Sequence, residues 1–405
     1  MKLKFLLIFF TFIFFSSCQT KDKNEAVTLK WTEVESIPAS FGNISKGVSA
    51  AFVGLLEDKL IVAGGCNFPD TPAAEGGKKV FYRDILMLDN GKWISLGELP
   101  EPLAYGVSVT TDEEIFFIGG QNEKSVKSVF RLRMEDEKLQ IKVISSLPVA
   151  IDNAAGYILG SKIFIAGGNQ DGKPSSDVWS YDLLNSENWQ KEFSLPIQGG
   201  LVQPALASQN VALYKKMKEL ADAQINVSMS VPQLFVFGGF SPATDNNPAS
   251  VNQDVWNLNE LSPEWVKSFN PFPSGETKNS LSGGVAVAFQ DSLILTIGGV
   301  NQQVFEDALN RNFHLSKVSE NNQDTLTTRF RSEAKAYLHH PAVWYRFNDE
   351  VWLYNVNRQE WKSLGKFPQA ALAGASAVGN DNEIYIVNGE IKPGIRTRKI
   401  WKITW

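Results

Sequence analysis

A run of apolar, strand-like residues that ends in a glycine doublet recurs along this chain, and it constrains the fold more than any other feature. An apolar run that ends in the doublet occurs five times, and at a sixth place Asn388-Gly389 takes the position of the doublet. Glycine is favoured where a backbone turns sharply with no room for a Cβ atom. A pattern repeated in this way predicts a fold built from equivalent units. The five doublets are Gly64-Gly65, Gly119-Gly120, Gly167-Gly168, Gly238-Gly239 and Gly298-Gly299.

Each unit carries further strand-like segments around its doublet. A strand rich in small residues precedes it, and a tryptophan further along opens another strand that we expect to pack one unit against the next. Units of four short strands resemble the kelch repeat. The resemblance implies an all-β fold, a six-bladed kelch-type β-propeller around a central channel. The tryptophans are Trp93, Trp189, Trp265 and Trp361.

The two ends of the sequence predict how such a ring closes. The last unit lacks the strand that opens with Trp, and the missing piece stands near the N-terminus, where Trp31 is followed by Pro38. We therefore expect residues 29–38 to complete the last blade, which removes free edge strands. The predicted propeller spans residues 29–405, after a linker at residues 19–28.

The first residues read as an export signal. Lys2 and Lys4 precede an apolar run at residues 5–15 that is too short to cross a bilayer as a helix. Small residues directly before Cys18 resemble a bacterial lipobox, so residues 1–18 are predicted to be a lipoprotein signal peptide with Cys18 as the lipidated residue. This predicts a lipid-anchored protein of the cell envelope, in the periplasm or at the outer membrane. The alternative is a plain secretory signal with an incidental cysteine.

Two insertions interrupt the repeat. Residues 209–230 place apolar side chains at spacings close to those of a helix, and residues 302–345 do so more clearly, with Phe305, Ala308 and Leu309 on one predicted face. We expect two helical or loop insertions on the faces of the propeller, where ligands enter.

Composition and motifs exclude several kinds of chemistry. The net charge of −5 gives no basic footprint for nucleic acid. The three histidines, His314, His339 and His340, have no metal-ligand spacing, so no metal and no cofactor are predicted. Cys66 follows a doublet and is predicted to be a small buried residue.

The sixth unit departs from the repeat, and this departure carries the candidate site. Glu390 directly follows Asn388-Gly389, and Arg396 comes six residues later. In another unit, Asn301 and Gln302 follow the doublet at a comparable position. Because each segment follows the innermost strand of its unit, all of these side chains are predicted to lie at the same end of the channel.

These segments resemble the bacterial N-acetylneuraminate epimerase family, the sialic acid mutarotases, in its cyclically permuted branch. A closed ring tolerates such permutation because its termini meet within one blade. The segments that carry the resemblance are residues 298–302, 388–390 and 392–397, with Gly77-Lys78-Lys79, Gly91-Lys92-Trp93, Gly97-Glu98-Leu99 and residues 104–108.

The resemblance implies an isomerase that interconverts the α and β anomers of N-acetylneuraminate without a cofactor. It implies that Glu390 is the proton acceptor and that Arg396 is also catalytic. It further implies a small sugar acid as partner, no obligate protein partner, and membrane attachment through the lipid anchor alone. The residues expected to bind substrate are Asn301, Gln302, Asn388, Lys392 and Arg396.

Physical chemistry agrees with these roles. Arginine binds a carboxylate bidentately, and one positioned carboxylate can accept and return the protons that mutarotation moves. We expect the cations Lys392 and Arg396 to offset the effect of burial on the pKa of Glu390. Leu103 and Ile151 stand where the family has arginines, which leaves sugar specificity open. The alternative function is a non-catalytic propeller that binds glycans or a partner protein at the cell envelope.

Overall fold

The computed structural model describes residues 27–185, 188–219, 223–259 and 262–405. The predicted signal peptide, Cys18 and most of the predicted linker lie outside these residues. Within the described ranges the chain is mostly β-strand, as expected from the sequence. Among those same residues, no helix combines the length and apolar character needed to cross a membrane.

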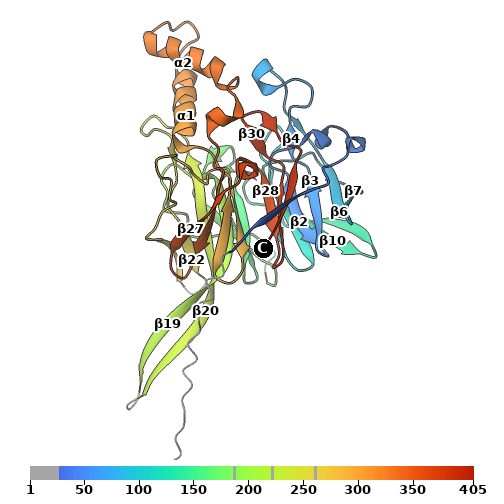
Figure 1. The fold of residues 1–405 in the computed structure, drawn as a ribbon, viewed down its shortest axis with the longest axis vertical. Helices are drawn as coiled ribbons and strands as arrows, with labels where there is room; N and C mark the ends of the chain where they lie inside the picture. The colour runs from blue at the N-terminus through green and yellow to red at the C-terminus, as the bar shows by residue number, and fades with distance from the viewer. Residues whose placement is uncertain (1–26, 186–187, 220–222, 260–261) are drawn as a thin grey trace, which may run out of the picture.

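Most of the described strands form six antiparallel sheets of four or five strands each (Figure 1). In all but the last sheet, the strands follow one another in sequence. The first three sheets contain, in order, β2 (Phe52–Leu56), β3 (Lys59–Ala63), β6 (Asp84–Asp89) and β7 (Lys92–Glu98); β8 (Val107–Thr110), β9 (Glu114–Ile118), β10 (Val129–Glu135) and β11 (Lys138–Val143); and β13 (Ala155–Leu159), β14 (Lys162–Ala166), β17 (Val178–Asp182) and β18 (Gln190–Lys191).

The other three sheets include the one that joins the two ends of the chain. There β1 pairs with β32, so that Trp31 lies opposite Ile403. These sheets contain β19 (Val202–Glu219), β20 (Ala223–Ser241), β22 (Trp256–Asn259) and β23 (Ser262–Lys267), with β21 (Ser250–Val251) beside β20; β24 (Val285–Phe289), β25 (Leu293–Ile297), β26 (Glu350–Asn355) and β27 (Glu360–Lys366); and β28 (Ser376–Gly379), β29 (Ile384–Val387), β32 (Ile400–Thr404) and β1 (Lys30–Val34).

Short strands and 3-10 turns extend from the ends of these sheets. They carry the residues that follow several of the doublets. The short strands are β4 (Cys66–Asn67) paired with β5 (Val80–Phe81); β12 (Ile151–Asp152), β15 (Asn169–Gln170) and β16 (Lys173–Pro174) in one sheet; and β30 (Glu390–Lys392) paired with β31 (Ile395–Arg396). The 3-10 turns are η1 (Ala39–Lys46), η2 (Ala73–Glu75), η3 (Ala342–Tyr345) and η4 (Pro368–Ala370).

A circuit of six backbone hydrogen bonds links the six sheets at the beginnings of β2, β8, β13, β19, β24 and β28. These strands, and not the strands before the doublets, which were expected to be innermost, contact one another from sheet to sheet. Each residue donates its N–H to the carbonyl of the previous one at 2.8 to 3.2 Å, and the sixth bond returns to the first residue. All six residues have φ between 51° and 69°. We call this circuit the girdle; its members, in bonding order, are Ala50, Tyr105, Asn153, Gln203, Gly283 and Gly374.

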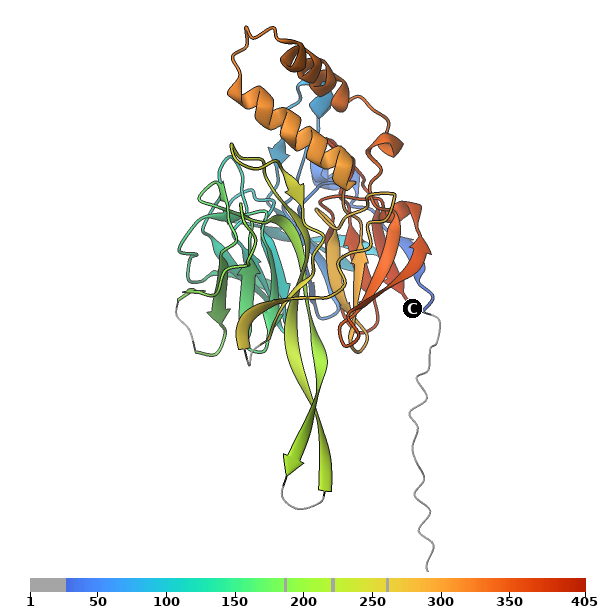
Figure 2. The same cartoon turned by 90° about the vertical axis from the view of Figure 1, so that its left-hand side faces the viewer.

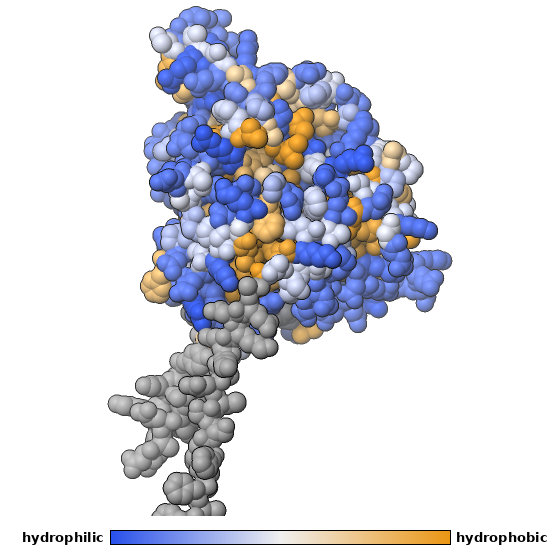
Figure 3. Space-filling view, viewed as in Figure 1, coloured by the Kyte–Doolittle hydropathy of each residue, from blue (hydrophilic) through white to orange (hydrophobic). Residues whose placement is uncertain are grey.

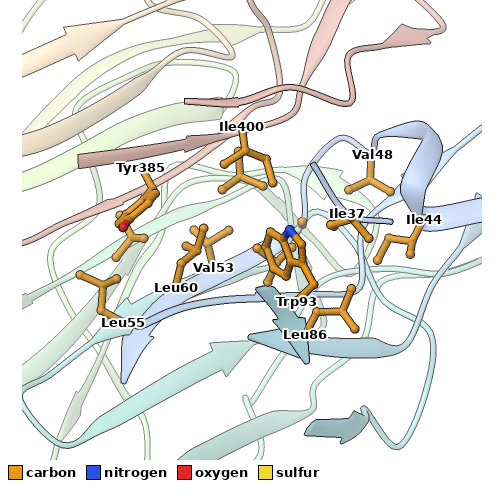
Figure 4. Packing of buried hydrophobic residues seen from close by; sticks show 14 residues of the cluster. Ile37, Ile44, Val48, Val53, Leu55, Leu60, Leu86, Trp93, Tyr385 and Ile400 are labelled. Carbon is orange, nitrogen blue, oxygen red and sulfur yellow. The ribbon is translucent and has the colours of Figure 1, made fainter. Parts of the chain in front are cut away.

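The hydrophobic core lies between neighbouring sheets. Figure 4 shows one such layer, where Trp93 of β7 packs among residues of β2, β3, β29 and β32. The indole N–H of Trp93 donates to the carbonyl of Glu35 at 2.8 Å, just after β1. Each of the four repeat tryptophans makes such a bond to the segment that follows the neighbouring sheet, and so contacts the next unit as predicted. The other three pairs are Trp189 with Ser145, Trp265 with Phe193 and Trp361 with Asn270.

One insertion is helical as expected, and the other is not. Residues 302–345 form α1 (Gln302–Lys317) and α2 (Thr325–Tyr337), which stand at one end of the molecule (Figure 2). The helical prediction for residues 209–230 is wrong, because β19 and β20 extend there as a long hairpin from the opposite end. Its apolar residues also fit alternation, as at Val227, Met229 and Val231, and pairing continues the register already set by the sheet.

The surface carries both polar and apolar residues. Figure 3 shows a mainly hydrophilic face on which apolar residues gather in a few patches. Cys66 is fully buried, as predicted.

Candidate functional site

A cavity of about 290 Å³ lies between the girdle and helix α1. Three girdle residues line it from one side, and the helical insertion supplies apolar and aromatic side chains from the other. Sugar pockets in proteins commonly combine such apolar walls with a few placed polar groups. The lining residues are Ser49, Tyr105, Gln203, Phe240, Val300, Asn301, Val304, Phe305, Ala308, Leu309, Asn312, Tyr337, Tyr345, Phe347, Ala373, Gly374, Glu390 and Pro393.

Glu390 and Arg396 form an ion pair at the edge of this cavity. They face each other across the β30–β31 hairpin, and Arg396 Nη2 lies 2.7 Å from Glu390 Oε1. Arg396 Nε donates to Ser49 Oγ at 3.1 Å, and the guanidinium lies over the ring of Phe68. The Arg396 side chain is 3 % exposed, and its Nη1 has no hydrogen-bond partner among the described residues. A buried guanidinium thus holds the carboxylate and keeps one donor free.

The environment of Glu390 raises its pKa. Burial is the largest cause, and it outweighs the opposing effects of Arg396, of Lys79 and of hydrogen bonds from the Gly394 backbone and Ser49. The expectation that cations would offset burial is therefore wrong. One of the two expected cations, Lys392, also points elsewhere. A carboxylate with a raised pKa is a stronger base than an exposed glutamate once it is ionised.

Tyr105 lines the cavity, and the exposed Lys79 contacts it without lining the cavity itself. Lys79 Nζ donates to the Tyr105 hydroxyl at 3.0 Å, and Cys66 Sγ donates to the same hydroxyl at 3.4 Å. Burial raises the pKa of Tyr105, so its phenol stays protonated at neutral pH. Both residues lie in motifs of the family resemblance, yet sequence reasoning did not single them out as site residues.

Asn301 lies at the cavity, whereas Gln302 does not. Asn301 lines the cavity together with Glu390, as the repeat geometry predicts. Its side chain caps α1 by accepting from Val304 N at 3.1 Å and donates to Thr277 O at 2.6 Å. Gln302 does not line the cavity and donates to Glu306 at 3.1 Å. Both amides therefore already make structural hydrogen bonds.

Asn388 and Lys392 also have structural contacts. Asn388 is 2 % exposed, has φ of 51° and donates from Nδ2 to Lys399 O at 3.3 Å. Lys392 Nζ donates to the carbonyls of Leu338 and His340 at 3.3 and 2.9 Å. Neither residue lines the cavity. Lys392 instead ties the segment after α2 to the hairpin that carries Glu390.

Leu103 and Ile151, at the positions of the family's arginines, do not line the cavity either. Both side chains are buried in the cores between sheets, and their carbonyls accept from Gly65 and Gly120 at 2.8 Å. Sequence reasoning missed Gln203 and the tyrosines of the insertion, Tyr337 and Tyr345. For Gln203 no signal was available, because its place depends on backbone bonds between distant strands.

Fold and site together define a β-repeat protein with a Glu–Arg ion pair at the edge of a partly open cavity. More particularly, the chain belongs to the N-acetylneuraminate epimerase family, whose model matches residues 16–141 and 144–405. Proteins named N-acetylneuraminate epimerase are similar to it: 30 % identical over 195 residues in Salmonella enteritidis PT4, 29 % over 195 in Salmonella typhi and 28 % over 172 in Yersinia pestis.

These alignments are partial. The match spans about half the length of the curated relatives: 47 % of this chain and of each Salmonella protein, and 42 % and 40 % for the Yersinia protein. Among solved structures, one titled "Structure of YjhT" is 21 % identical and covers 64 % of both chains, with a TM-score of 0.48.

Proposed function

We propose that this protein is a mutarotase that interconverts the α and β anomers of N-acetylneuraminate. The observation that carries the proposal is the Glu390 carboxylate, which is 22 % exposed, lines a sugar-sized cavity and is held by Arg396. Family membership supports the same activity. A general base must lie where substrate can reach it and must be positioned, and Glu390 meets both requirements.

In the proposed reaction Glu390 moves the protons that ring opening and closure require. The ionised carboxylate takes the proton of the anomeric hydroxyl, whose oxygen becomes the ketone oxygen as the bond from the anomeric carbon to the ring oxygen breaks. Glu390 then gives that proton to the ring oxygen, which becomes a hydroxyl. Rotation about the neighbouring carbon–carbon bond exposes the other face of the ketone, and the same steps in reverse close the ring as the other anomer. Protons balance over the cycle, and Glu390 ends ionised.

Arg396 is proposed to act on both the base and the substrate. Its Nη2 holds Glu390, and its Nη1 is the buried donor without a described partner. An unpaired buried donor is costly, and a sugar carboxylate next to the anomeric carbon would satisfy it. Arg396 does not itself line the cavity, so this contact requires its guanidinium to shift toward the bound sugar. Arg396 would thereby bring the anomeric hydroxyl to Glu390.

We also propose that the six sheets are the blades of a closed kelch-type propeller spanning residues 29–405. Three observations support closure: the girdle returns to its first residue, β1 joins the sheet of β32, and the Trp93 layer fills the space between the first and last sheets. In such a ring the girdle would surround the channel axis and form the floor of the cavity.

For the location of the protein we propose the cell envelope, with a lipid on Cys18. The basis is the sequence of residues 1–18, with its basic start, apolar run and small residues before the cysteine. Cys18→Ala should move the protein from the membrane to the soluble fraction. A variant that stays with the membrane would contradict lipid anchoring.

The activity is tested by proton NMR of freshly released α-N-acetylneuraminate. With the protein present, the signal of the β anomer should grow faster than in buffer alone, to the same final ratio. An unchanged rate, with protein that melts cooperatively, would contradict the proposed function.

A further inference from the structure

Two side-chain amides form a chain that ends on a buried carboxylate beside the cavity. Gln203 Nε2 donates to Asn153 Oδ1 at 2.9 Å, and Asn153 Nδ2 donates to Asp152 Oδ1 at 2.6 Å. Gln203 and Asn153 are neighbours in the girdle. Of the three residues, Gln203 alone lines the cavity.

Asp152 is fixed by neutral donors on several sides. It is 3 % exposed, and besides Asn153 it accepts from Asn169 Nδ2 at 2.8 Å and from the Ser125 hydroxyl. Among the described residues it forms no ion pair with Lys or Arg. Ser125, Asn169 and Asp152 come from different segments, so the carboxylate is anchored independently of the amides that it faces.

This arrangement determines which way both amides point. An ionised carboxylate can only accept, so Asn153 must turn its NH₂ toward Asp152 and its oxygen toward Gln203. Gln203 must then direct its own NH₂ at Asn153. Its Oε1 is left facing the cavity, and a Cβ atom added at Gly283 would lie 3.5 Å from it. Gln203 Oε1 is therefore an oriented hydrogen-bond acceptor at the cavity, and it has no partner among the described residues.

Gln203 lies across the girdle from the acid–base pair. Ala50 is three bonds away in either direction, and its neighbour Ser49 contacts Arg396. Between Gln203 and the side of Glu390, the girdle residues are Gly283 and Gly374. Neither has a side chain that could fill the space between Gln203 and Glu390. A Cβ atom added at Gly374 would meet one atom within 4 Å, at Ser49. A sugar ring in this cavity would lie over this bare backbone, between Glu390 and Gln203.

We propose that Gln203 determines substrate specificity by accepting a hydrogen bond from the amide N–H of the substrate's acetamido group, and that Asp152 positions it. The proposal rests on the proposed function. In N-acetylneuraminate the acetamido group sits on the ring carbon opposite the anomeric carbon. A sugar held at its anomeric end by Glu390 and Arg396 would present that N–H on the side of Gln203.

Two substrates and two variants test the proposal by NMR mutarotation kinetics. The substrates are N-acetylneuraminate and its analogue with hydrogen in place of the acetamido group. For wild-type protein we expect a KM roughly 3- to 10-fold lower for N-acetylneuraminate, the ratio expected of one neutral hydrogen bond. Gln203→Leu should abolish this preference and leave kcat for N-acetylneuraminate within about twofold. Asp152→Asn should weaken the preference in wild type and have no further effect on it in the Gln203→Leu background.

Gln209→Leu is the matched control, since Gln209 lies on the same strand but binds the carbonyls of Gln290 and Leu293 away from the cavity. It should keep the wild-type preference. A preference that survives in Gln203→Leu, or a KM raised equally for both substrates, would overturn the role of Gln203 while leaving the mutarotase proposal intact. A wild-type protein without mutarotase activity would overturn both.

Discussion

The turn after β3 and the turn after β29 have nearly the same backbone but different tasks. In the first, Gly65 N–H donates to the carbonyl of Leu103 at 2.8 Å; in the second, Gly389 N–H donates to that of Val48 at 3.0 Å. A Cβ atom at Gly64 would lie 2.3 Å from Leu103 O, whereas the equivalent Asn388 carries a side chain. The same hydrogen bond between sheets is therefore compatible with either a glycine or an asparagine.

The second turn has a close approach of its own beside Val48. A Cβ atom at Gly47 would lie 2.2 Å from Thr397 O, so glycine is needed at this position. The residue after each turn differs as well. Cys66 is wholly buried, but Glu390 reaches the cavity. At the second turn the charged side chain is held by Arg396 of its own hairpin.

Replacing Glu390 tests the proposed role of the turn after β29 most directly. Glu390→Gln keeps the shape of the side chain and removes the proton acceptor, so mutarotation should fall by about 100-fold or more. KM should change by no more than a few-fold. Glu383→Gln is the control, because Glu383 pairs with Lys402 on the same sheet, outside the cavity. Full activity in Glu390→Gln, measured by NMR, would remove Glu390 as the base.

Replacing Arg396 should have the next largest effect. Arg396→Ala removes the proposed donor to the sugar carboxylate, and a charged hydrogen bond of about 1.5–3 kcal/mol corresponds to a KM raised roughly 10- to 100-fold. It also leaves Glu390 without its cation, which raises the pKa of that carboxyl further, so KM should be compared at alkaline pH. Arg398→Ala, at an exposed position on the same segment, should behave as wild type. An unchanged KM would mean that Arg396 serves Glu390 alone.

Replacing Gly64, in the turn after β3, should lower the free energy of unfolding and leave the rate of mutarotation unchanged. Gly64→Ala places a Cβ atom against Leu103 O and forces alanine to φ of 61°, which should cost on the order of 1–3 kcal/mol of unfolding free energy. Gly172→Ala shares the positive φ, 77°, but has nothing within 4 Å. Urea unfolding should therefore show a larger loss for Gly64→Ala. Equal losses would mean that φ alone, and not the close approach, requires glycine.

The repeat made the scaffold predictable, since spacing alone located the turns, the tryptophans and the strand that joins the two termini. Glu390 and Arg396 could be singled out as candidate site residues because the sixth unit departs from the repeat at Asn388-Gly389. The hairpin at residues 209–230 was not, because a short apolar pattern fits two periods and the adjoining sheet chooses between them. Gln203 and Asn153 were missed because their positions depend on girdle bonds between distant segments.

The smallest expected effect concerns Lys79. This residue lies on the segment that follows the turn after β3, and its charge acts on Glu390, which follows the turn after β29. Burial raises the pKa of Glu390, and the charge of Lys79 lowers it. The base must be ionised, so kcat/KM falls as the pH drops through this pKa, at a higher pH than for an ordinary glutamate. Lys79→Met removes a cation that favours the ionised form, and the acid limb of the profile should move to higher pH. Lys78→Met removes an equal charge from an exposed neighbour and should move it less. An equal shift in both variants would mean that Lys79 acts through net charge and not through its place beside Tyr105.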